Sequence, residues 1–261
     1  MEIIIDPNKE IYDNANTYFE NVKKMRKKLE DTKKAIEETK KEIEKESEKT
    51  EEKRKRKEER ENKPEKKEWY MQYHWFFTTD GFLAIAGKSA GQNEEIVKKR
   101  LEDDDLFFHA DIVGAPALVL KKGKNAPESS LKQAAQFSAC YSSAWKTGYS
   151  TVDVYYVAKE QVSKSPPSGE YLQKGSFFIS GRKNYFRGVP LKLLIGLSRD
   201  DKISCVPEVT GAEHFKICFI LEPGRYSKDI VAEKIAKQLN AKKDEIVPYI
   251  PTGNASFSRL K

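Results

Sequence analysis

The chain has 261 residues, of which 34% are charged and 38% hydrophobic, and its 48 Lys/Arg against 41 Asp/Glu give a formal net charge of +7. Its three cysteines are widely spaced without a C-x-x-C pair, which argues against a disulfide framework or a zinc site and favours a reducing compartment. No stretch approaches the roughly 20 apolar residues that cross a bilayer, and the N-terminus lacks the apolar region of a signal peptide. We therefore expect a cytoplasmic protein without a membrane segment.

Charged and apolar residues are divided unevenly at Trp69. Residues 1–68 carry 21 Lys/Arg and 20 Asp/Glu and contain no Trp and no Gly. Residues 69–261 carry 27 Lys/Arg and 21 Asp/Glu and hold all three Trp and all fourteen Gly. Only this second segment has the composition of a domain that buries a core. Its positive charge fits either a polyanionic partner or a Lys-rich solvated surface.

Residues 11–43 carry a heptad repeat with spacings that alternate between four and three residues. The repeat comprises Ile11, Ala15, Tyr18, Val22, Met25, Leu29, Thr32, Ile36, Thr39 and Ile43. This pattern predicts a coiled coil or a long amphipathic helix. After Ile43, the residues to 68 are mostly Glu, Lys and Arg, which predicts a solvated helical arm that Pro64 interrupts. The pattern does not distinguish among three partners for the repeat, namely a second copy of the chain, a returning helix and another protein.

Residues 69–261 predict hairpins with helices between them. Strands are expected at 73–79 and 82–87 around an Asp80-Gly81 turn, and at 105–111, 116–122, 151–158, 176–180, 191–198 and 214–222. Helices are expected at 93–102, at 128–148 with Ser129 as N-cap and Gly148 as its end, and at 229–240. A turn is expected at Pro223-Gly224. The predicted fold class is α+β, with a mixed, largely antiparallel sheet and packed helices, preceded by the long coiled-coil helix.

The sequence offers little support for an enzyme. His109 and Asp111 share a strand face and, with Cys140, could suggest a nucleophile and its base, but Cys140 lies on the apolar face of a predicted helix. A structural cysteine and a hydrogen-bonded histidine are the favoured interpretation. Phosphate-loop, G-x-S-x-G and metal-ligand signatures are missing from the sequence. We therefore predict no catalytic residues, no metal and no cofactor.

The positive charge of the folded segment is concentrated in residues 161–192. This stretch carries six Lys/Arg and one acidic residue, Glu170, whereas residues 69–160 carry 10 Lys/Arg and 11 Asp/Glu. Basic and aromatic residues on a glycine-bent sheet edge suit RNA, through phosphate contacts and base stacking. The alternative is a solvated edge strand above core residues Phe177 and Ile179. The segment "SPPSG" at 165–169 is expected to form the turn that presents the first of the predicted nucleic-acid-binding residues, which are Lys164, Lys174, Arg182, Lys183, Asn184, Tyr185, Arg187 and His109.

Several long blocks of the sequence resemble the NFACT family. The block "EWYMQYHWFFTTDGFLAIAGKSAGQNEEIVKKRL" resembles the opening of its NFACT-R domain. The blocks "DDLFFHADIVGAP", "AAQFSACYSSAW" and "EQVSKSPPSGEYLQKGSFFISGRKNYFRGVPL" follow in the family's order. The likeness is almost continuous over residues 69–200. Upstream, "IDPNKEIYDNANTYFENVKK" resembles the segment that leads into the family's coiled coil, and the tail from about 205 to 261 resembles an extension of archaeal members.

The resemblance implies three segments: a coiled-coil and charged helical arm at 1–68, an NFACT-R RNA-binding domain at 69–200, and a strand-helix extension at 201–261 packed on that domain. It implies a C-terminal fragment of an archaeal-type ribosome quality control factor, because the family's N-terminal domain has no counterpart here. The implied function is a non-catalytic RNA- and ribosome-binding module at stalled nascent-chain complexes, with large-subunit rRNA and tRNA as partners. The alternative is a scaffold of the same pathway, whose coiled coil binds ribosomal or quality-control proteins or forms a homodimer.

Overall fold

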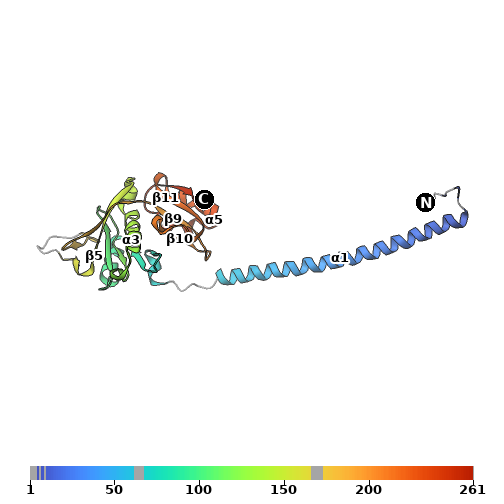
Figure 1. The fold of residues 1–261 in the computed structure, drawn as a ribbon, viewed down its shortest axis with the longest axis horizontal. Coiled ribbons are helices and arrows are strands. Elements are labelled where there is room, and N and C mark those ends of the chain that lie inside the picture. The colour runs from blue at the N-terminus through green and yellow to red at the C-terminus, as the bar shows by residue number, and fades with distance from the viewer. Residues whose placement is uncertain (1–4, 6, 9, 62–67, 166–172, 261) are drawn as a thin grey trace. The chain divides into compact units, whose positions relative to one another are not determined.

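The computed structural model describes residues 5, 7–8, 10–61, 68–165 and 173–260. It divides into two compact units, Met1–Lys67 and Glu68–Lys261. The first unit contains the helix α1 (Ile11–Glu61), drawn in blue in Figure 1. The long N-terminal helix expected from the heptad repeat is therefore confirmed. The predicted interruption at Pro64 lies outside the described residues.

The heptad face of α1 is exposed within its unit. Ile11, Val22, Met25, Leu29 and Ile36 all show more than a third of their surface to solvent. The two threonines that interrupt the repeat return their hydroxyls to their own helix, as Thr32 Oγ1 donates to Lys28 O at 2.7 Å and Thr39 Oγ1 donates to Ala35 O at 2.8 Å. Their polar groups are thus satisfied locally, and the apolar stripe continues past them.

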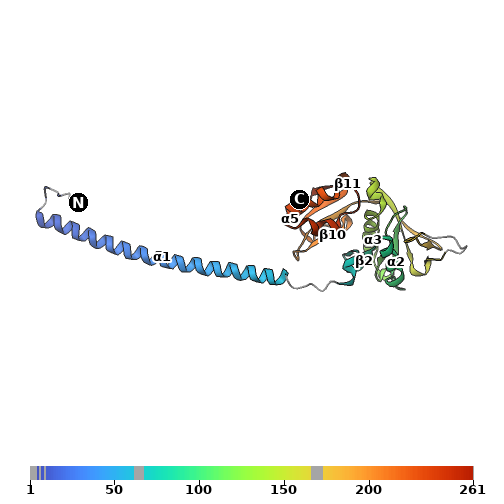
Figure 2. The ribbon, with the colours of Figure 1, turned by 180° about the vertical axis from the view of Figure 1, so that it is seen from behind.

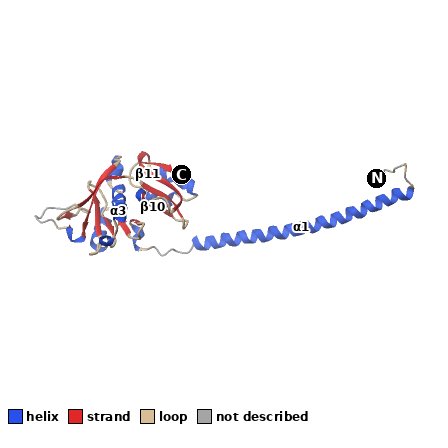
Figure 3. Cartoon of the chain, in the orientation of Figure 1, coloured by secondary structure: helices blue, strands red, loops and turns tan. Residues whose placement is uncertain are grey.

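The second unit begins with a six-stranded sheet in the order β1-β2-β4-β3-β5-β8. Every pairing between its described strands is antiparallel. Its edges are formed by β1 and β8, so the basic stretch of the sequence supplies one open edge. Figure 3 shows the strands in red. Their bounds are β1 (His74–Phe77), β2 (Leu83–Ala86), β3 (Leu106–Ala110), β4 (Leu118–Leu120), β5 (Thr151–Ala158) and β8 (Asn184–Pro190).

A second, four-stranded antiparallel sheet follows, in the order β10-β9-β11-β12. Its strands are β9 (Leu193–Ser198), β10 (Ile203–Pro207), β11 (Phe215–Tyr226) and β12 (Ala255–Arg259). The segment boundary expected between residues 200 and 201 falls inside this sheet, between β9 and β10. The short strands β6 (Val162–Ser163) and β7 (Phe178–Ile179) pair separately as a ribbon.

Helix α3 (Glu128–Cys140) lies between the two sheets and contacts β3, β5 and β8 on one side and β10 on the other. In Figures 1 and 2 the strands β10 and β11 and the helix α5 lie on one side of α3. The remaining helices are α2 (Ala90–Lys99), α4 (Ser143–Thr147), α5 (Lys228–Leu239) and α6 (Lys243–Ile246). Single 3-10 turns occupy Trp69–Gln72, Gly123–Asn125, Lys159–Gln161, Glu208–Thr210 and Val247–Tyr249.

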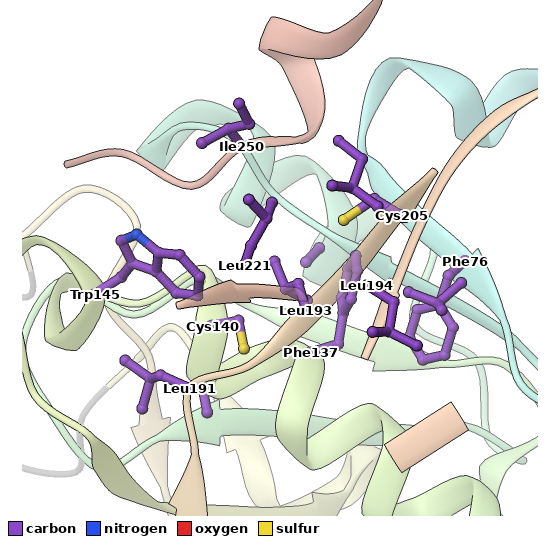
Figure 4. Packing of buried hydrophobic residues seen from close by; sticks show 14 of the residues in the cluster. Phe76, Phe137, Cys140, Trp145, Leu191, Leu193, Leu194, Cys205, Leu221 and Ile250 are labelled. Carbon is purple, nitrogen blue, oxygen red and sulfur yellow. The ribbon is translucent and has the colours of Figure 1, made fainter. Parts of the chain in front are cut away.

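The main core forms around α3 because this helix is buried at every residue from Gln133 to Cys140. Figure 4 shows side chains from both sheets converging with Phe137 and Cys140 of this helix. Two aromatic side chains in this core bond to backbone carbonyl groups, as Trp145 Nε1 donates to Asn254 O at 3.2 Å and Tyr141 donates to Tyr249 O at 2.7 Å. A smaller core covers the other face of the six-stranded sheet.

Three local predictions were wrong. The helix expected at 128–148 breaks after Cys140, and Ser142 caps the separate helix α4, while Gly148 ends it at φ 79° as expected. Ser129 lies inside α3, whose N-cap is Pro127, and its hydroxyl donates to Asp80 Oδ2 at 2.8 Å. The turn expected at Pro223-Gly224 is a bulge, through which β11 continues, because β12 supplies a partner for it.

Candidate nucleic-acid interface

Strand β8 carries a β-bulge at the open edge of the six-stranded sheet. Val152 and Val154 of β5 pair with Val189 and Phe186, so two residues of β8 face Asp153 alone. Asp153 holds the bulge, accepting from Gly188 N at 2.8 Å and from Arg187 Nη1 at 2.5 Å. Gly188 has φ +60°, a backbone region that favours glycine. Because of the extra residue in the bulge, Val189 lies on the same face of the sheet as Phe186 and packs in the main core.

Aromatic rings form a row across three strands on the face opposite α3. His109 of β3 pairs with Tyr155 of β5, and Tyr155 pairs with Tyr185 of β8. The His109 and Tyr155 ring centroids are 5.7 Å apart, and those of Tyr155 and Tyr185 are 5.9 Å apart. His109 and Tyr185 at the two ends of the row are half-buried, whereas Tyr155 between them is buried.

Two cations cover this row. Lys183 Nζ lies 4.2 Å from the centroid of the Tyr155 ring, and the Arg187 guanidinium carbon lies 3.9 Å from that of Tyr185. Cation–π contacts of this kind hold a positive charge against an aromatic face. We call these residues, Tyr155, Lys183, Tyr185 and Arg187, the aromatic-basic surface. It combines the two groups that single-stranded nucleic acids bind, namely cations for phosphates and rings for bases.

Two carboxylates moderate the charge of the aromatic-basic surface. Tyr185 donates its hydroxyl to Asp111 Oδ2 at 3.4 Å, and Asp153 pairs with Arg187. Burial, followed by the charge of Asp111, raises the pKa of Tyr155 to about 12, so this tyrosine stays neutral at physiological pH. The hydrogen bond from Arg187 lowers the pKa of Asp153. Arg187 is therefore partly neutralised, while Lys183 has no ion-pair partner among the described residues.

Burial lowers the pKa of His109, so its ring is neutral at physiological pH and cannot act as a cation there. Its ring stacks on Phe107 with centroids 6.2 Å apart. This arrangement makes His109 the inner end of the aromatic row. The sequence identified it as a polar contact residue, and the structure places it beside Lys183 and Tyr185 as part of the same face.

The other predicted residues are divided among different places. Lys164 lies against α2, with Nζ 3.1 Å from Glu94 Oε1, and Lys174 is also near this carboxylate. Gly175 N donates to the same Glu94 at 3.2 Å. Glu94 thus attaches the ribbon to α2 and neutralises the charge of Lys164. Most of "SPPSG", the turn expected to present Lys164, lies outside the described residues.

Arg182 and Asn184 belong to the opposite side of the β8 edge. Both side chains are exposed, and together with Lys183 they line an open depression of about 590 Å³. The depression reaches to Glu128 and Leu131 at the start of α3. The eight predicted residues therefore do not form one strip.

The sequence interpretation missed Tyr155, Tyr156 and the two carboxylates. The stretch 69–160 carries no excess of positive charge, so counting charges could not indicate it. A usable signal was the pair Tyr155-Tyr156 in the centre of an alternating strand, because consecutive residues of a strand face opposite sides. That pair places one tyrosine on each face of the sheet beside β8.

The residues considered for catalysis are not brought together. Cys140 is fully buried in the main core, whereas His109 lies in the aromatic row on the other face of the sheet. Burial raises the pKa of the Cys140 thiol well above its usual value, which disfavours a nucleophilic thiolate. Among the described His, Cys, Asp and Glu side chains, no three gather where they would hold a metal ion. Every helix in the described ranges is too short or too polar to cross a membrane.

The folded unit of the chain matches a known family. The model of the NFACT protein RNA binding domain matches residues 72–181. Its match includes His109 and Tyr155 and ends one residue before Arg182. The archaeal Rqc2 homolog aRqcH of Methanocaldococcus jannaschii is 40% identical over 198 residues, which is 73% of this chain and 29% of that protein. The chain belongs to the NFACT family. Its membership confirms the resemblance found in the sequence.

Other NFACT relatives are also matched over part of their length. The human ribosome quality control complex subunit NEMF is 39% identical over 142 residues, or 53% of this chain and 13% of that protein. A solved C-terminal structure of the fibronectin/fibrinogen-binding protein from Streptococcus suis aligns with a TM-score of 0.40 at 23% identity, over 49% of each chain. That likeness is too low to carry an argument. The chain thus spans less than a third of the archaeal and human relatives named here.

Proposed function

We propose that this NFACT chain is a non-catalytic RNA-binding module that acts in ribosome-associated quality control. Its RNA would be that of the large ribosomal subunit, or tRNA, at complexes with a stalled nascent chain. The support for the pathway is the matched RNA binding domain and the naming of relatives as ribosome quality control factors. The cysteines of the described residues are free thiols, which supports a cytoplasmic location.

The observation that carries the RNA-binding proposal is the aromatic-basic surface at an open sheet edge. Lys183 and Arg187 each lie over a tyrosine ring, and the half-exposed ring of Tyr185 can stack on a base while the two cations contact phosphates. RNA modules built on sheets use this combination of stacking and phosphate contact. A solvated edge strand needs its lysines to be exposed, whereas Lys183 is partly buried against Tyr155.

The experiment changes Arg182, Lys183 and Arg187 together to Glu and measures the binding of tRNA and of a large-subunit rRNA fragment against salt concentration. Removing one cation that binds a phosphate reduces the slope of log K against log salt by about 0.7–0.9. We expect weaker binding and a reduction of about two units. A matched control changes Lys216 of β11, Lys237 of α5 and Lys243 of α6 to Glu. An equal reduction in the control, or unchanged slope in the first variant, would contradict the proposed site.

The exposed heptad face of α1 favours a second function, that of a scaffold which binds quality-control proteins. The repeat places Arg26, Lys33 and Lys40 at the flanking position that follows every second seam residue. In a parallel or an antiparallel homodimer of α1, these cations or Lys28 would face positive charges on the second copy. We therefore expect any homodimer to strengthen as salt screens the repulsion, as sedimentation of the full chain at two salt concentrations will measure. A dimer that weakens as the salt concentration rises would contradict this pairing of like charges.

A further inference from the structure

The open depression on the α3 side of β8 is separate from the aromatic-basic surface. Asn184 and Phe186 of β8 project to this side because they alternate with Tyr185. Asn184 pairs with Tyr156 of β5, and the rings of Tyr156 and Phe186 lie 5.7 Å apart at 31°. Both rings are partly exposed and line the depression. Its floor is therefore aromatic, and it extends a stack that begins at Phe108 within the core.

Polar side chains surround this aromatic floor. Within the described parts of the chain, the side chains of Arg182 and Asn184 have no hydrogen-bond or ion-pair partner. The carboxylate of Glu128 stands at the far side, 2.8 Å from Lys132. A volume of about 590 Å³ lies within the range of about 300–1,000 Å³ typical of sites for small ligands. The depression thus offers a stacking surface, an amide, a carboxylate and a free guanidinium.

These groups match one unpaired nucleotide. A base can stack on Phe186 and Tyr156, with its hydrogen-bonding edge toward Asn184 and Glu128 and its phosphate toward Arg182. Proteins that read single-stranded RNA splay a base onto an aromatic side chain and bind its edge in this way. Double-stranded RNA keeps its bases stacked and cannot offer one to a depression of this kind. Lys183 lines the depression and also covers Tyr155, so one cation adjoins both faces of the β8 edge.

We propose that the depression formed by Tyr156, Arg182, Asn184, Phe186 and Glu128 binds a single unpaired base of RNA, whose backbone crosses the β8 edge to the aromatic-basic surface. This proposal rests on the RNA-binding function proposed above. It adds selectivity for single-stranded over double-stranded RNA, which phosphate contacts alone do not supply.

The test compares the full chain with the double variant Asn184→Ala/Phe186→Leu, by fluorescence anisotropy. The probes are a labelled single-stranded RNA of about ten nucleotides, a duplex RNA with the same number of phosphates per strand, and adenosine monophosphate as competitor. We expect the variant to bind the single strand about 5- to 150-fold more weakly, the range for removal of one stacked base, and to bind the duplex unchanged. The matched control is Phe77→Leu at the opposite edge of the sheet, which we expect to leave both affinities unchanged.

A second measurement does not depend on the folding of a variant. Ultraviolet crosslinking of the native full chain to the same single-stranded RNA is expected to modify peptides that contain Tyr156 or Phe186. Equal weakening of single-strand and duplex binding in the double variant, or crosslinks confined to other peptides, would overturn the base site and leave RNA binding intact. Competition by the mononucleotide at RNA-like affinity would overturn it in favour of a free-nucleotide site. Failure of the native chain to bind either RNA would refute the proposed function itself.

Discussion

His74 is a half-buried histidine at the junction of the two sheets. Its ring stacks on Tyr141 with centroids 4.0 Å apart, and Tyr141 donates to Tyr249 O on the side of the second sheet. Burial, followed by the charges of Lys88 and Lys228, lowers the pKa of His74 to about 3. The folded chain therefore keeps this ring neutral over a pH range in which the unfolded chain protonates it.

This histidine predicts mild acid sensitivity. Below pH 6.5 the unfolded state binds a proton that the folded state excludes. The free energy of unfolding therefore decreases as the pH is lowered from about 6.5 to about 3. From pH 7 to pH 5 the decrease due to His74 is about 2 kcal/mol. The variant His74→Phe keeps the stack and should lose this part of the pH dependence. Chemical denaturation of both proteins at several pH values measures it, and parallel curves would contradict the assignment.

Asp153 has two roles at the bulge, since it binds Gly188 N and also neutralises Arg187. In Asp153→Asn the amide oxygen can still accept from the backbone, but Arg187 regains its full charge. We expect tighter RNA binding and an increase of about 0.7–0.9 in the salt slope, equal to one more phosphate contact. Titration with tRNA at several salt concentrations tests this. The control Asp201→Asn removes a carboxylate paired with Lys216 at a distant loop and should not change the slope.

At the scale of elements, the second sheet depends on close contact between β9 and β11. A Cβ at Gly196 would overlap the carbonyl oxygen of Ile217 and lie 2.7 Å from Cys218 Cα. Both of these are backbone atoms, so rotation of a side chain cannot relieve the overlap. The residue's identity is therefore decided by the neighbouring strand.

We predict that Gly196→Ala destabilises the chain by about 1–3 kcal/mol, the usual cost of overpacking. The control is Gly91→Ala in α2, where the added methyl meets only Ser89 Oγ at 3.9 Å. There alanine should stabilise by about 0.5–1 kcal/mol, because it is the better helix former. Thermal and denaturant unfolding measure both variants. Similar effects of the two changes would refute the strand-contact explanation.

The elements also show which local signals are sufficient. The alternation in residues 151–158 predicted β5 with the bounds that the structure shows. The continuous apolar pattern of residues 128–148 predicted one helix, but the chain breaks at Tyr141, whose ring and hydroxyl bind His74 and Tyr249. Periodicity describes a helix face, and it holds no information on contacts with residues that are distant in sequence.

At the scale of the whole molecule, the two units are predicted to be energetically independent. Among the residues that the structure describes, both cores are built from side chains between Tyr70 and Leu260. A chain starting at Glu68 should therefore unfold cooperatively with the same midpoint as the full chain and should retain its RNA affinity. Calorimetry and anisotropy of the two proteins test this. A midpoint lowered by several degrees would show that α1 stabilises the folded unit.

The sequence by itself determined the long helix, the α+β class, the family and the basic character of residues 161–192, because these depend on local periodicity, composition and contiguous motifs. Only the tertiary structure decided which predicted binding residues work together. Register and the bulge at Asp153 direct Lys183, Tyr185 and Arg187 to one face, and Asn184 to the other. Lys164 lies on neither face of β8, because it pairs with Glu94 of α2, which is far away in sequence. Ion pairs and strand neighbours are contacts between distant residues, and composition does not encode them.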